Sequence, residues 1–263
     1  MLVESFQTRK QSMKIYLNGD SHTAGAELVS NYCFAKDDPQ YLHMGELAHP
    51  RCLELSYGAK LSRTLNAGYN CDAISASSNA RILRTTKRFI SEKRPETVIV
   101  IGWSTWEREE WFYNDWHYQV TASGTDSVPE ELAAKYKQWV NEQTREELIK
   151  KQKYWHEQIY LLHKELLERD IKHVFFNSYS HFDSVDPVDW SDCYIDPYTQ
   201  AGTYWHWCSA QGFTTVNNGY HYGEDAHIAW ARYLLPRLTT VENASNIVKV
   251  KKAKINTVLR VNR

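Results

Sequence analysis

The chain has 263 residues, of which 42% are hydrophobic, and its formal net charge at pH 7 is −1. This length and composition are sufficient for one hydrophobic core in a single domain. The nearly balanced charge does not indicate binding to nucleic acid or to a membrane surface. No apolar run approaches the roughly 20 residues that a transmembrane helix requires. The sequence therefore predicts no nucleic-acid and no membrane partner, and it leaves the oligomeric state open.

The N-terminal segment 1–12 is polar and mixed in charge, which is not typical of a secretory signal peptide. We interpret it as an extension that precedes the first strand. Five cysteines are scattered along the chain without a CxxC pair. Neither a disulfide framework nor a metal knuckle is predicted from that pattern. Together these features predict a protein located inside a cell or in a virion.

The first strong signal is a short apolar run, Ile15-Tyr16-Leu17, that stops at Gly19-Asp20-Ser21. A helix-compatible segment follows, so the pattern predicts a strand–turn–helix junction with Ser21 at its corner. In an open α/β sheet, ligands bind beyond the carboxyl ends of the strands. Ser21 is therefore a candidate nucleophile, and the alternative is that it only caps the helix.

Periodicity predicts the later elements in order, and strands alternate with helices. We expect a helix at 52–65, a strand at 66–74, a helix from Ser78 or Asn79 to about 93, a buried strand at 97–103, one long or broken helical stretch at 130–169, a strand at 171–177, an irregular segment at 178–218, and a last helix ending near Leu235-Pro236. This alternation predicts a three-layer α/β/α sandwich around a parallel sheet with right-handed crossovers.

The predicted domain covers residues 13–237 and contains an aromatic-rich insertion at 104–129. The chain has 10 Trp and 17 Tyr, so aromatic side chains form either core or an interaction surface. Residues 238–263 form a basic tail in which apolar and basic residues alternate between 248 and 251. A solvated edge strand with protective lysines and a site for an anionic partner are both compatible with this tail.

Near the end of the domain, His221-Tyr222-Gly223-Glu224-Asp225-Ala226-His227 precedes the last helix. Combined with the early Gly19-Asp20-Ser21, this order resembles the SGNH (GDSL-like) hydrolase superfamily. The resemblance implies a flavodoxin-like sheet, Ser21 as nucleophile, His221 as base and a structural role for His227. It implies a small ester or an acylated carbohydrate as substrate, and no cofactor.

Three positions beside this pair differ from the family pattern. The resemblance places the acid that orients the histidine three residues before it, where this chain has Asn218. An asparagine can hold an imidazole tautomer by a hydrogen bond, but it cannot stabilise the imidazolium by charge. Asp192, Asp196 and Asp225 are alternatives that no spacing argument separates.

The resemblance also implies an oxyanion hole built from the Ser21 amide, the amide of a second-motif glycine and a third-motif asparagine. Here Ala76 stands in the glycine position and Ser104 in the asparagine position. Loss of one oxyanion donor typically lowers turnover about 10²–10³-fold. The sequence therefore leaves two functions open, a weak esterase or an SGNH-fold protein kept for binding or structure.

The run Gly102–Trp111, with Ser78-Asn79 and Arg81-Ile82, also resembles SGNH-like proteins of tailed phages that infect marine cyanobacteria. Trp103, Trp106 and Asn79 are the predicted substrate-binding residues, since aromatic rings at a site mouth stack on sugars or line an acyl pocket. A lid packed against the body is the alternative. His173, His181 and His206 show no metal-ligand spacing, and no metal site is predicted.

Overall fold

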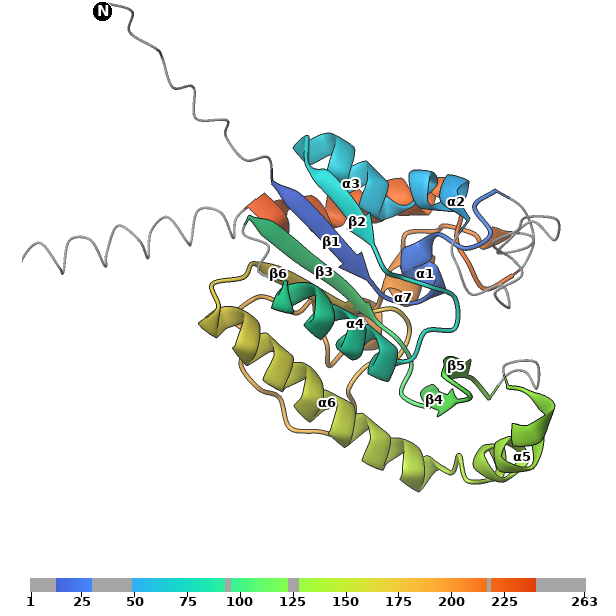
Figure 1. Ribbon diagram of the computed structural model, residues 1–263. Coiled ribbons are helices and arrows are strands. Elements are labelled where there is room, and N and C mark those ends of the chain that lie inside the picture. The colour runs from blue at the N-terminus through green and yellow to red at the C-terminus, as the bar shows by residue number, and fades with distance from the viewer. Residues whose placement is uncertain (1–12, 30–48, 93–95, 123–127, 217–218, 240–263) are drawn as a thin grey trace, which may run out of the picture.

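The protein is described here by a computed structural model that covers residues 13–29, 49–92, 96–122, 128–216 and 219–239. Its central sheet has four parallel strands in the order β2-β1-β3-β6 (Figure 1). These strands are β1 (Lys14–Asn18), β2 (Gly68–Cys71), β3 (Thr97–Trp103) and β6 (His173–Asn177). Tyr16 pairs with Asn70 on one side and with Ile99 on the other, which fixes the register of the central strand. The predicted parallel α/β sheet is confirmed.

Helices cover both faces of this sheet because its strands are apolar on both faces. Helices α3 (Tyr57–Leu65), α7 (Tyr204–Ala210) and the C-terminal helix 224–239 pack on the face that presents Leu17. Helices α4 (Asn79–Ser91) and α6 (Arg145–Glu168) pack on the face that presents Tyr16 (Figure 1). The two apolar faces become two separate halves of the core, which is the predicted three-layer arrangement.

Two predicted elements differ in detail from the structure. The expected helix at 52–65 is two helices, α2 (Pro50–Leu55) and α3, because Ser56 between them is extended and donates its hydroxyl to Leu53 O. The last helix does not end near Pro236 but continues to residue 239. Leu238 is buried against the sheet one turn after Leu234, so tertiary packing overrides the helix-ending tendency of proline.

A third prediction, that residues 178–218 are irregular, is wrong over residues 204–210, which form α7. Thr203 caps this helix by accepting a hydrogen bond from the His206 amide. Tyr204 and Cys208, one turn apart, are both buried against the sheet. The helical stretch expected at 130–169 is confirmed, and of its two predicted forms the structure shows the broken one, with η3 (Glu130–Leu132), α5 (Ala133–Asn141) and α6.

The aromatic-rich segment after β3 forms an antiparallel hairpin of β4 (Glu109–Tyr113) and β5 (Trp116–Val120). A small apolar cluster joins this hairpin to α5 through Trp111, Val120 and Trp139. Neither the predicted extension 1–12 nor residues 240–263 of the predicted tail lies within the described residues. None of the helices in the described part of the chain has the length and apolar character of a membrane span.

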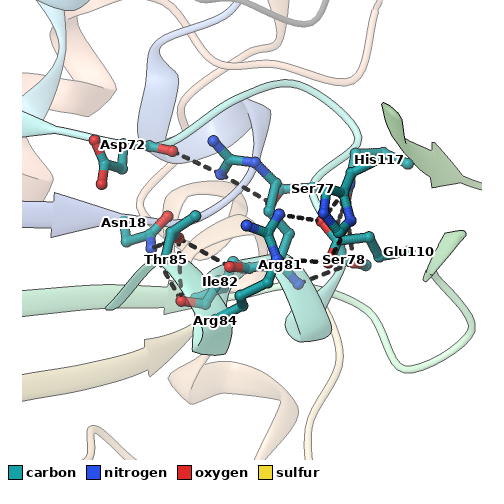
Figure 2. Close-up of polar contacts among 11 residues, drawn as sticks. Asn18, Asp72, Ser77, Ser78, Arg81, Ile82, Arg84, Thr85, Glu110 and His117 are labelled. Atoms are coloured by element: carbon teal, nitrogen blue, oxygen red, sulfur yellow. Dashed lines mark hydrogen bonds and ion pairs between the residues drawn. The ribbon is translucent and has the colours of Figure 1, made fainter. Parts of the chain in front are cut away.

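Polar contacts attach the hairpin to the start of α4 (Figure 2). Arg84 donates two hydrogen bonds to the Glu110 carboxylate, at 2.9 and 2.6 Å. Gln119 donates to Glu110 at 3.0 Å and accepts from the Ser78 amide at 2.8 Å. The side chain of Gln119 therefore satisfies an amide at the start of α4, which helix geometry leaves without a backbone partner.

Asn18, at the end of β1, connects the sheet to α4 on the same face (Figure 2). Its side-chain nitrogen lies 2.7 Å from Thr85 Oγ1, 3.0 Å from Thr86 Oγ1 and 3.0 Å from Ile82 O, and the Gly19 amide donates to its oxygen at 2.9 Å. Asn18 is fully buried. A fully satisfied buried amide of this kind fixes the position of the chain just before Gly19.

We expect Asn18→Ala to lower the free energy of unfolding by about 2–4 kcal/mol, because it leaves several buried polar groups without a partner. Chemical denaturation followed by circular dichroism measures this. Lys87→Ala, on the exposed face of the same helix, is the control and should change stability by less than about 0.5 kcal/mol. Equal effects of the two variants would contradict the anchoring role of Asn18.

Candidate active site

Ser21 lies at the carboxyl end of β1, next to β3. The chain leaves β1 toward one edge of the sheet, where β2 lies, and leaves β3 toward the other edge, where β6 lies. The order β2-β1-β3-β6 places this switch between β1 and β3, where open α/β sheets bind ligands. Ser21 is the first residue of the short helix α1 (Ser21–Ala24). A Cβ on the preceding Gly19 would lie 2.2 Å from Thr23 Oγ1 and 2.8 Å from Gly102 O, so only glycine fits this turn.

The carboxylate of Asp20 is buried and accepts hydrogen bonds from residues that follow three different strands. It accepts from the Ser104 hydroxyl after β3 and from the Ser178 hydroxyl after β6, each at 3.1 Å. It also accepts from the His22 amide at 3.1 Å and thereby caps α1. Arg108 Nη1 is 3.4 Å from the same carboxylate. Asp20 therefore holds the Ser21 turn against the neighbouring strands.

Ser21 and His221 lie in direct contact although 200 positions separate them in the sequence. The distance from Ser21 Oγ to His221 Nε2 is 2.8 Å. Ser21 is 7% exposed, and the His221 side chain is 12% exposed. The predicted proximity of these two residues is confirmed, and it gives the serine hydroxyl a base within hydrogen-bond reach.

The second ring nitrogen of His221 faces a carboxylate that sequence analysis missed. His221 Nδ1 is 3.0 Å from Glu27 Oε2. Among the described residues neither atom has an aligned hydrogen-bond partner, so this is a close ion-pair distance without hydrogen-bond geometry. Catalytic hydrogen bonds are often poorly aligned before substrate binds. Glu27 reaches His221 from a backbone conformation with φ of 67°, which is uncommon for a residue other than glycine.

The predicted orienting residue, Asn218, lies outside the described residues. The three alternative aspartates, Asp192, Asp196 and Asp225, are all exposed to solvent. The carboxylate at His221 comes instead from the segment after α1, only six residues beyond the serine. The sequence does show an acidic residue, Glu27, shortly after the Gly-Asp-Ser turn. Its side chain faces His221 only because the backbone at Glu27 adopts a left-handed conformation.

The structure shows the conformation of Ala76 and the hydrogen bonds of Ser104, the two residues at predicted oxyanion positions. Ala76 has φ of 59°, a left-handed conformation that suits the glycine for which it stands. The Ser104 hydroxyl donates to Asp20 and accepts from Arg108 Nη1 at 2.9 Å. The only hydroxyl proton of Ser104 is therefore engaged in the hydrogen bond to Asp20. The neighbouring Arg108 guanidinium has five N–H donors, more than its contacts with Ser104 and Asp20 require. Arg108 Nε is buried without a partner among the described residues.

The predicted substrate-binding residues lie inside the protein. Trp103 is fully buried with its ring edge-on to Phe175 at 5.6 Å, and Trp106 stacks on Phe182 at 4.5 Å. Asn79 is fully buried and exchanges two hydrogen bonds with the backbone of Ser104, at 2.8 and 3.1 Å. The structure thus places these residues in the supporting core, and Asn79 positions Ser104.

Two further histidines, His22 and His227, surround the pair and are buried. Burial lowers the pKa of His22 to about 3, an effect that Asp20 opposes. Burial and, to a smaller degree, the neighbouring His22 and His221 lower the pKa of His227 to about 3. His227 Nδ1 accepts from the Tyr57 amide at 3.1 Å, and its ring stacks on the Tyr57 ring. Both histidines are therefore neutral near pH 7, and the ring of His22 lies 5.0 Å from the ring of His221.

The chain matches the model of a protein family described as "Family of unknown function (DUF6071)" over residues 38–206. The matched region includes Ala76, Asn79, Ser104 and Arg108, and it excludes Ser21 and His221. No curated protein matches the chain significantly.

Two solved structures are distantly similar to the chain. One is a carbohydrate esterase whose active site is described as having divergent catalytic and non-catalytic binding functions. It has 17% sequence identity and a TM-score of 0.41, over 88% of this chain and 66% of that chain, just under two thirds of its length. The other is a protein of Parabacteroides merdae assigned as a GDSL-like lipase. It has 13% identity and a TM-score of 0.43, over 88% of this chain and 97% of that one.

We expect stability to fall as pH decreases from about 6.5 toward 3, because the folded pKa of His22 and His227 lies below the unfolded value of about 6.5. Over this range the unfolded chain binds protons that the folded chain excludes. Each such histidine contributes a loss of up to about 1.4 kcal/mol per pH unit. Urea denaturation at several pH values between 7.5 and 4 measures the slope.

His227→Gln tests the source of this slope, because a glutamine oxygen can still accept from the Tyr57 amide while the titrating group is removed. The variant should show a shallower loss of stability with falling pH than the wild type. His117→Gln, at an exposed histidine of the hairpin, is the control. A slope that His227→Gln leaves unchanged would contradict this assignment.

Proposed function

The chain belongs to the family of unknown function DUF6071, and we propose that it is a serine-dependent carboxylic-ester hydrolase. The observation that carries the proposal is the line of side chains from Ser21 through His221 to Glu27, with separations of 2.8 and 3.0 Å. A nucleophile, a base and an orienting carboxylate in contact form the arrangement that activates a serine hydroxyl. The proposed triad differs from the sequence prediction in its acid, Glu27 in place of Asn218.

In the proposed reaction, Ser21 Oγ attacks the ester carbonyl carbon while its proton moves to His221 Nε2. Collapse of the tetrahedral intermediate breaks the bond to the alcohol, which leaves with the proton from His221. Water then hydrolyses the acyl-enzyme by the same route and regenerates the Ser21 hydroxyl. Glu27 stabilises the imidazolium at both stages. It carries the negative charge that the neutral Asn218 lacks.

The negative charge on the carbonyl oxygen needs donors that are in place before the reaction. We assign this role to the backbone amides of Ser21 and Ala76, as the family resemblance implies. Arg108 supplies the third donor, because the Ser104 hydroxyl already donates to Asp20. The link from Arg108 through Ser104 to Asp20 holds the guanidinium near the serine turn.

For the substrate we propose an ester on a carbohydrate or another small alcohol. The β4–β5 hairpin lies beyond the carboxyl ends of the sheet strands, on the same side as α1 (Figure 1). It exposes Phe112 and Trp116, which are 65% and 60% accessible to solvent. Exposed aromatic faces provide stacking surfaces for sugar rings. These residues take the place of the buried Trp103 and Trp106 as candidate substrate contacts.

Hydrolysis of a nitrophenyl acetate and of acetylated sugars by the purified protein tests the proposal. We expect Ser21→Ala to reduce the rate at least about 100-fold, to the level of buffer. Ser91→Ala, at the exposed end of α4, is the control for nonspecific effects of the substitution. Equal rates for wild type and Ser21→Ala would reject the hydrolase and favour a binding protein that uses this fold.

Glu27→Gln separates the proposed triad from a serine–histidine pair alone. The substitution keeps side-chain size and removes the charge, so kcat should fall about 10²–10⁴-fold while KM changes little. Glu54→Gln, at an exposed acid on α2, should leave both constants unchanged. If Asn218 were the orienting residue, Asn218→Ala would lower kcat instead, and Glu27→Gln would have no effect.

A further inference from the structure

A second cluster of chemically reactive side chains lies at the amino end of the sheet, opposite to Ser21. His163 on α6, His173 at the start of β6 and Cys193 in the following loop each present one ligand atom, and these atoms lie within 4.8 Å of one another. His163 and His173 are each 1% exposed, and Cys193 is 7% exposed. The hydrolase proposal uses none of these residues.

The orientation of His173 is fixed by the backbone. His173 Nδ1 is 2.9 Å from Ile171 O, and a carbonyl oxygen only accepts, so Nδ1 carries the proton. The lone pair of Nε2 then points toward His163 Nδ1, at a distance of 2.8 Å. A histidine that donates one nitrogen to a carbonyl and presents the other is the usual arrangement of a metal ligand.

We propose that His163, His173 and Cys193 form a site for a thiophilic divalent cation, Zn²⁺. Two imidazoles and one thiolate, with no carboxylate among them, favour zinc over magnesium or calcium. With Zn–N near 2.0 Å and Zn–S near 2.3 Å, ligand atoms around a tetrahedral ion are about 3.3–3.6 Å apart. The two rings must therefore separate by about half an ångström, and the Cys193 sulfur must move in by at most about 1.3 Å.

Binding displaces protons in a defined way. His163 Nδ1 donates to His173 Nε2 in the metal-free state, so that proton moves to His163 Nε2. The Cys193 thiol donates to Ser191 O at 3.4 Å, and its proton is released to solvent when the thiolate binds the metal. Asp189 acts electrostatically on both His163 and Cys193 and offsets the positive charge that remains.

The proposed ion would have a structural role. Cys193 O accepts from the Phe175 amide at 2.7 Å, and the Ile195 amide donates to Phe175 O at 2.9 Å, so this loop extends the sheet beside β6. The loop then leads to α7, whose Tyr204 packs against the ring of His22 at 5.5 Å. A metal that joins α6, β6 and the loop stabilises this edge and, through α7, the wall behind the active site.

The test uses the full chain without a histidine tag, purified and also refolded in the presence of metal. Elemental analysis should find about one zinc per chain. Titration of the metal-free protein with Co²⁺ should produce a thiolate-to-cobalt charge-transfer band, and zinc should raise the melting temperature by several degrees. Cys193→Ser should abolish the band, and His173→Gln should weaken binding at least tenfold.

Cys208→Ala is the matched control, since Cys208 is an equally buried thiol on the other face of the sheet. This variant should keep the cobalt band and the zinc-dependent rise in melting temperature. A folded wild-type protein with no cobalt band and no response to zinc, even after refolding with metal, would overturn the proposal. A metal that Cys193→Ser retains as tightly as the wild type would do the same.

Discussion

The carboxylate of Asp20 is the constraint on which the site depends. It is buried and accepts hydrogen bonds from Ser104 and Ser178, so the ends of β1, β3 and β6 meet at a single group. A buried carboxylate is costly unless donors surround it, and these donors come from three strands that only the folded sheet brings together. The placement of the Ser21 turn therefore depends on the assembled sheet.

The same network engages Ser104, the residue predicted from sequence as an oxyanion donor. Ser104 uses its hydroxyl to satisfy Asp20, and Asn79 holds the backbone of Ser104 through two hydrogen bonds. A side chain engaged in this way supports the turn and has no proton left for the substrate. Arg108 lies at the edge of the same network, where a permanently charged group has donors to spare.

Polar contacts also fix the position of the β4–β5 hairpin relative to α4. Gln119 bridges the start of α4 to Glu110. Arg84 completes the contact with two hydrogen bonds to the Glu110 carboxylate (Figure 2). The hairpin is thus fixed to the helix that follows the Ala76 turn. Phe112 and Trp116 belong to this hairpin, so its contacts with Ser78 and Arg84, which are distant in the sequence, also position these exposed rings.

The sequence by itself determined the parallel α/β sheet, because continuous apolar strands alternate with amphipathic helices. The contact between Ser21 and His221 was an expectation that came from the resemblance of their motifs to SGNH hydrolases, and the structure shows that contact. Glu27 was not predictable, since it reaches His221 only through a left-handed backbone that no sequence periodicity encodes. The burial of Trp106 and the convergence of His173 with Cys193 were likewise decided by tertiary structure. Strand register and loop path bring together residues whose spacing along the chain carries no regular pattern.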